Sequence, residues 1–135
     1  GAYRAAGRGR KARTSPIKDY AVELGIQVKQ PETFRSDEAR AELTRLQPDA
    51  IIVAAYGKLL PKSVLDVPKM GCLNIHPSLL PRHRGPSPVA TTILNRDGVT
   101  GVSIMLLDEG MDTGPLIAQH EFFLQGDENT DDLTK

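Results

Sequence analysis

Hydrophobic and polar positions along the chain predict helices wherever apolar residues recur every three or four positions between capping and breaking residues. Ser15 offers an N-cap for a helix over residues 16–24, which has apolar positions at that spacing and stops before a glycine. A second helix is expected over residues 36–46, where acids occupy the first turn and leucines form a buried stripe. Shorter helices are expected over residues 61–67 and 89–94.

Short apolar runs between these helices predict the strands of a sheet. Residues 50–55 are apolar on both faces and bounded by turn residues, which is typical of a fully covered central strand. Residues 101–107 and 116–124 are expected to pair antiparallel, because the connection between them is short. Further short strands are expected over residues 26–29 and 72–75. The order of these elements predicts an α/β domain with a mostly parallel, mixed sheet.

The composition of the 135 residues is that of an ordinary globular protein, with 39% hydrophobic and 25% charged residues. No apolar run approaches the roughly 20 residues needed to cross a membrane, so no membrane partner is expected. Cys72 is the only cysteine and cannot form an internal disulfide, which favours a reducing compartment.

Charge is distributed unevenly although the formal net charge is zero. Residues 1–18 carry six basic side chains and no acid, so the remainder has a net charge of −6. A basic end on an acidic protein suggests a polyanionic partner for that end, whereas charge alone favours the simpler alternative of a solvated loop. No secretory signal is expected, and Gly7 and Gly9 argue against an amphipathic transit peptide.

Asn74 and His76 are the first candidates for chemistry. They lie two residues apart at the end of an expected strand, so both side chains should face the same side of the sheet. An amide donor and a titratable imidazole would then project from the carboxyl end of the strand, where ligands of open α/β sheets bind. The alternative is a histidine bonded to a neighbouring backbone group and an asparagine that caps a turn.

Asp112 is the second candidate, because Gly110 and Gly114 on either side allow its backbone to approach a ligand closely. A carboxylate beside His76 would orient the imidazole ring. Asp108 and Glu109 are alternatives from spacing alone. All these acids could also be ordinary solvated residues of a turn.

Other site classes fit the chain less well. The three histidines and the lone cysteine do not have the spacing of a zinc site, so no metal is expected. No Gly-x-Ser-x-Gly elbow surrounds a serine. A generic nucleotide-binding domain would need a phosphate loop, and the glycines at positions 7 and 9 lack the Lys-Ser/Thr ending of one.

Two motifs together resemble the signature of the formyltetrahydrofolate-dependent formyltransferases. The first is Asn74-x-His76-Pro-Ser-Leu-Leu-Pro-Arg-x-Arg-Gly85, and the second is Gly110-x-Asp112-Thr-Gly114 within residues 108–114. The resemblance implies a catalytic trio of Asn74, His76 and Asp112, with 10-formyltetrahydrofolate as the formyl donor and no metal. It also suggests a cis peptide bond at Leu80-Pro81, in the proline-rich loop of the first motif.

The resemblance extends over nearly the whole chain and adds binding residues. It implies that a segment with backbone atoms lining the folate pocket comprises Tyr56, Gly57, Lys58, Leu59 and Leu60. The basic start, over residues 4–14, is similar to a loop typical of the branch that formylates initiator methionyl-tRNA. On that resemblance Arg8 is the leading candidate for tRNA contact, and the side chains expected to attract phosphates are those of Arg10, Lys11 and Arg13.

The resemblance also implies how the domain is organised. Residues 1–135 are expected to be part of a Rossmann-like catalytic domain that lacks the family's first strand-helix-strand unit and the C-terminal domain of the tRNA branch. The complete protein is expected to be a monomer in the bacterial cytoplasm, or in the mitochondrial matrix if eukaryotic. Glycinamide ribonucleotide, an amino sugar nucleotide or water remain alternative acceptors, and a non-catalytic folate- or RNA-binding module remains an alternative function.

Overall fold

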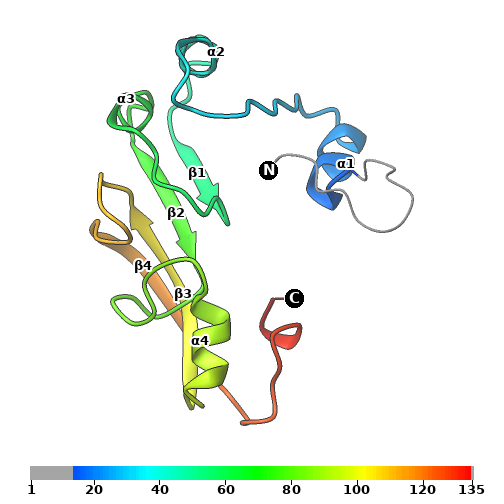
Figure 1. The fold of residues 1–135 in the computed structure, drawn as a ribbon, viewed down its shortest axis with the longest axis vertical. Coiled ribbons are helices and arrows are strands. Elements are labelled where there is room, and N and C mark those ends of the chain that lie inside the picture. Colours follow the sequence, from blue (N-terminus) through cyan, green and yellow to red (C-terminus); the bar gives the residue numbers. More distant parts are fainter. Residues whose placement is uncertain (1–13, 135) are drawn as a thin grey trace.

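A computed structural model describes residues 14–134 of the chain. Its centre is a four-stranded sheet in the order β1-β2-β3-β4, with short helices beside it (Figure 1). The strands are β1 (Ile51–Ala54), β2 (Cys72–His76), β3 (Val99–Leu106) and β4 (Leu116–Phe123). The helices are α1 (Pro16–Glu23), α2 (Asp37–Arg45), α3 (Lys62–Leu65), α4 (Pro88–Leu94) and the 3₁₀ turn η1 (Asp132–Thr134).

The sheet is mixed, as expected, but it is not mostly parallel over the described residues. β1 and β2 pair in parallel, whereas β2 with β3 and β3 with β4 pair antiparallel. The chain leaves β2 at His76 and enters β3 near the same end of the sheet, and His76 lies opposite Ser103 in the antiparallel pair. The connection holds only the seven-residue helix α4 and does not carry the chain back along the sheet. The β3–β4 pairing confirms the prediction of an antiparallel pair.

Two expectations about strands are wrong for the described part of the chain. β1 lies at an edge of the sheet, not at its centre, and alternate residues are exposed, including Ile52 at 60%. Residues 26–29 form no strand, because strands need a hydrogen-bonded neighbour and this segment runs away from the sheet between α1 and α2 (Figure 1).

Serine side chains cap the first two helices, as the sequence predicts. The Ser15 hydroxyl accepts a hydrogen bond from the Lys18 amide at 3.3 Å, and the Ser36 hydroxyl accepts one from the Ala39 amide at 3.2 Å. These contacts satisfy backbone donors that have no partner within the helix. No helix in residues 14–134 is long and apolar enough to span a membrane.

The hydrophobic core joins α2 and α3 to the parallel strands. Leu60, Val64 and Cys72 are buried together, and partly buried side chains from α2, β1 and the segment after β1 pack around them. Met105 on β3 is fully buried. This packing fixes the start of β2 and the chain after β1, and both segments lead into the cleft described below.

Cys72 is buried, and its burial raises the pKa of its thiol. Because the thiolate is the reactive form, we expect alkylation of folded protein near neutral pH to be roughly a hundredfold slower than in denaturant. Mass spectrometry of the peptide that contains Cys72, after timed exposure to iodoacetamide, measures both rates. Equal rates in the two conditions would show that β2 opens readily.

Candidate active site

A cleft of about 500 Å³ lies where three segments of the chain meet. Residues 53–60 run from the end of β1, residues 74–77 end β2, and residues 107–112 follow β3. Gly85 and Pro86, from the loop before α4, and Pro88, the first residue of α4, also line the cleft. Segments distant in sequence therefore converge on one space.

Asn74, His76 and Asp112, the expected catalytic trio, all line this cleft. The Asn74 amide donates to Asp112 Oδ1 at 3.5 Å, and His76 Nδ1 lies 3.8 Å from the same oxygen. The His76 side chain is 6% exposed and that of Asp112 is 11% exposed, so bulk water screens their interaction weakly. The structure brings together the three residues that the sequence singles out.

The tautomer of His76 follows from its neighbour on the other side of the ring. His76 Nε2 lies 2.9 Å from the backbone carbonyl of His83. A carbonyl oxygen only accepts hydrogen bonds, so Nε2 carries the proton in the neutral ring. Nδ1 is then the nitrogen that can gain a proton, and it faces Asp112.

Asp112 reaches the ring because its loop is tightly folded. Its backbone has φ 52°, in the left-handed region, and its Oδ2 accepts a hydrogen bond from the Gly85 amide at 2.8 Å. Asp108 holds the same loop, because its Oδ1 accepts from the Gly110 amide at 2.9 Å and from the Thr113 hydroxyl at 2.7 Å. Among residues 14–134, Asp112 is the only acid paired with His76, so Asp108 and Glu109 do not orient the ring.

The expected folate-binding segment borders the same cleft as the Asp112 loop. Tyr56, Gly57, Lys58, Leu59 and Leu60 all line the cleft. Positive φ angles at Ala55 (49°) and Gly57 (68°) turn the chain sharply after β1 and direct this segment along the cavity.

The proline-rich loop between β2 and α4 is fixed by a buried polar network. The Leu80-Pro81 peptide bond is cis, as the family resemblance suggests. The Ser103 hydroxyl donates to the Ser78 carbonyl at 2.6 Å and accepts from the Leu80 amide at 3.0 Å. The Gln119 side chain donates to the Leu80 carbonyl at 2.9 Å and to Ser103 Oγ at 2.8 Å. Side chains of strands β3 and β4 thus hold the loop in place.

Sequence reasoning missed several residues that shape the site. The Gly85 amide and the His83 carbonyl contact the trio through main-chain atoms, which no side-chain motif reveals. Ser103 lies outside both motifs, and only its polarity within an apolar strand could have marked it. Met111 and Pro86 line the cleft beside the motif residues.

Some expectations lie outside what the structure describes. The residues expected to contact tRNA are all in the undescribed segment 1–13: Arg8, Arg10, Lys11 and Arg13. Among residues 14–134, no cluster of three or more His, Cys, Asp or Glu side chains has the arrangement of a metal site.

Comparison with known proteins places this site in a family context. The family model described as formyl transferase matches residues 2–135. A methionyl-tRNA formyltransferase of Roseiflexus sp. (strain RS-1) is 53% identical over 132 residues, which is 98% of this chain and 41% of that protein. One from Marinobacter nauticus (strain ATCC 700491 / DSM 11845 / VT8) is 50% identical over 93% of this chain and 40% of the relative. The chain thus spans about two fifths of the length of these curated relatives.

A solved structure shares the fold. Phosphoribosylglycinamide formyltransferase from Bacillus halodurans superposes with a TM-score of 0.78 at 32% identity, over 90% of this chain and 66% of that one. The sequence motifs, the cleft and these matches agree, and the chain belongs to the formyl transferase family.

Proposed function

We propose that the protein transfers a formyl group from 10-formyltetrahydrofolate to the amino group of initiator methionyl-tRNA. The observation that carries this proposal is the convergence of Asn74, His76 and Asp112 in one cleft. The relatives of about 50% identity that bear the name methionyl-tRNA formyltransferase support this acceptor.

The reaction requires a bond between the acceptor nitrogen and the formyl carbon to form, and the bond from that carbon to the folate nitrogen to break. Attack of the amine turns the formyl oxygen into an oxyanion. In our proposal Asn74 donates a hydrogen bond to this oxyanion, since its side-chain amide lies in the cleft and is held by Asp112. Such a donor stabilises the transition state more than the planar formyl group.

His76 is proposed to move the proton. The attacking amine must lose a proton and the leaving folate nitrogen must gain one. Nδ1 of His76 is free to take up that proton, because Nε2 already donates to the His83 carbonyl. Once protonated, Nδ1 faces the Asp112 carboxylate 3.8 Å away, which stabilises the imidazolium.

The donor is proposed to lie along the wall formed by residues 56–60. Tyr56 and Leu59 supply apolar surface to the cleft, and the chain turns sharply at Ala55 and Gly57. Planar aromatic ligands bind in clefts of this kind, which combine apolar walls with a few fixed polar groups. The proposed contacts of the tRNA are made by Arg8, Arg10, Lys11 and Arg13.

We also propose that this chain forms part of a larger catalytic domain, with the family's first strand-helix-strand unit beside β1. Among residues 14–134, β1 lies at the edge of the sheet and Ile52 is 60% exposed. Both features support that arrangement, because an apolar strand edge is normally paired or covered. A neighbour there would give residues 50–55 the central position that their apolar character predicts.

A formyl-transfer assay with the full-length protein tests the proposed function. 10-formyltetrahydrofolate is the donor, and methionyl-tRNA and glycinamide ribonucleotide are offered in parallel. We expect formylation of methionyl-tRNA, with kcat/KM at least about a hundredfold higher than for the other acceptor.

Each outcome of this assay has a definite reading. Preferential transfer to glycinamide ribonucleotide would keep the trio and replace the acceptor, a possibility favoured by the fold shared with the B. halodurans enzyme. Folate binding without transfer to either acceptor would favour a non-catalytic binding module.

A further inference from the structure

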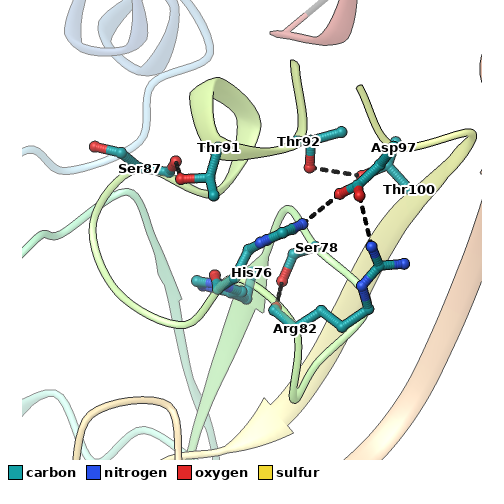
Figure 2. Close-up of polar contacts among 9 residues, drawn as sticks. His76, Ser78, Arg82, Ser87, Thr91, Thr92, Asp97 and Thr100 are labelled. Carbon is teal, nitrogen blue, oxygen red and sulfur yellow. Dashed lines mark hydrogen bonds and ion pairs between the residues drawn. The ribbon is translucent and has the colours of Figure 1, made fainter. Parts of the chain in front are cut away.

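Asp97, which neither motif contains, holds two side chains of the loop that leads away from the trio. Its Oδ1 accepts from Arg82 Nη2 at 2.6 Å, and its Oδ2 contacts His83 Nε2. Figure 2 shows the Arg82 guanidinium reaching across the loop to Asp97. The side chains of Asp97 and His83 are 10% and 12% exposed, so this contact is shielded from water.

Asp97 is itself fixed in place. It follows α4 and precedes β3, and its backbone amide donates to the Thr92 carbonyl at 3.1 Å. Thr92 is fully buried and lies beside Thr100 on β3, their hydroxyl oxygens 3.4 Å apart (Figure 2). The carboxylate therefore projects from a rigid junction of helix and strand.

His83, the loop residue that Asp97 holds, contacts the proposed catalytic residue His76 through its backbone. The His83 carbonyl accepts the hydrogen bond from His76 Nε2 at 2.9 Å. His83 has φ 54°, a left-handed conformation that a non-glycine residue adopts only when its surroundings hold it. Its ring is held by Asp97, while the Ser103 network holds residues 78–80 and the Ser78 hydroxyl bonds to the Arg82 carbonyl at 2.7 Å.

We propose that Asp97 is a positioning residue for formyl transfer, acting through the His83 ring on the His83 carbonyl that fixes the orientation and tautomer of His76. Asp97 touches neither His76 nor the wall of the cleft, so it acts at a distance through one residue. The inference rests on the proposed function for its effect on catalysis, but its effect on His76 is measurable without any assay of activity.

The test compares Asp97→Asn with the wild type in the full-length protein. The substitution keeps the size of the side chain and removes the charge that holds Arg82 and His83. We expect kcat to fall roughly tenfold, with each KM changed less than about twofold, because the binding wall is untouched and only alignment is lost. We also expect the His76 Hε2 proton, observed in ¹⁵N-edited spectra, to exchange with water at least about tenfold faster.

Two further variants separate positioning from folding. His83→Asn tolerates the left-handed backbone but is too short to reach Asp97, so it should reproduce both effects while Asp97 stays intact. Asp66→Asn is the matched control, since Asp66 is exposed just after α3 and its carboxylate, among residues 14–134, pairs only with Lys62, at 2.9 Å. This control should leave kcat and the exchange rate within about twofold of wild type.

The outcomes distinguish this inference from the proposed function. Unchanged kcat and Hε2 exchange in both Asp97→Asn and His83→Asn, with active wild type, would overturn the positioning role alone. If the wild-type protein transfers no formyl group and Hε2 exchange is still faster in Asp97→Asn than in the wild type, the effect of Asp97 on His76 would be supported and the proposed function refuted. A fall in kcat matched by an equal loss of folded protein, with Hε2 exchange unchanged, would make Asp97 structural only.

Discussion

Replacing His76 with asparagine in the full-length protein is expected to lower kcat for formyl transfer by about three orders of magnitude. The imidazole can take a proton on Nδ1 while Nε2 stays bonded to the His83 carbonyl. Asparagine keeps a polar side chain, but its amide group acts as neither an acid nor a base near neutral pH. Steady-state rates with saturating donor and acceptor measure the effect on kcat separately from binding.

The matched control is His120→Asn. His120 is exposed on β4, and its ring packs against that of Phe122 away from the cleft. This variant should keep kcat within about twofold of wild type, because surface substitutions perturb the fold little. If His76→Asn retained more than about a tenth of the wild-type kcat, general acid–base catalysis by His76 would have to be abandoned.

The second large effect is expected from Gly114→Ala, which should lower the free energy of unfolding by about 3 kcal/mol. A Cβ atom at Gly114 would lie 1.8 Å from the Leu106 carbonyl oxygen and 3.0 Å from its carbon. Both are backbone atoms of β3, so the connection to β4 must open to admit the methyl group. Chemical denaturation followed by circular dichroism measures the loss.

Gly98→Ala serves as the comparison for this substitution. Gly98 is exposed between α4 and β3, and a Cβ there would meet no atom within 4 Å. Its free energy of unfolding should stay within about 1 kcal/mol of wild type, since only backbone entropy changes. Equal destabilisation by the two alanines would mean that close packing at the Asp112 loop is not what demands glycine.

Helices and the late strand pair could be predicted from local pattern, whereas the sheet could not be predicted in full. Ser15 and Ser36 mark helix starts because capping depends on neighbouring backbone groups alone. The edge position of β1 depends on which strands are present beside it, which an apolar run such as 50–55 does not record. Residues 26–29 show the same limit, because strand-like residues form a strand only beside a partner.

For the site, too, some residues could be predicted from the sequence and others could not. Asn74, His76 and Asp112 were candidates from residue type and spacing, and the family resemblance grouped them as a trio; the structure brings them within hydrogen-bond or near contact distance. Spacing alone left Asp108 as an alternative, because the two acids lie only four residues apart; the resemblance chose Asp112, and the loop geometry pairs Asp112 and not Asp108 with His76. Asp97 could not be found from a motif, since its contact with the loop is made only when α4 and β3 are in place.

The contacts made by main-chain atoms have a consequence for how this site tolerates variation. The His83 carbonyl and the Gly85 amide hold His76 and Asp112, and every amino acid supplies a carbonyl at position 83. Side-chain substitutions in the loop would therefore affect the site by changing the path of the backbone, and not by removing the main-chain hydrogen-bonding groups. Chemical replacement of the amide before Gly85 by an ester, which deletes the donor and keeps every side chain, is the direct way to remove that bond.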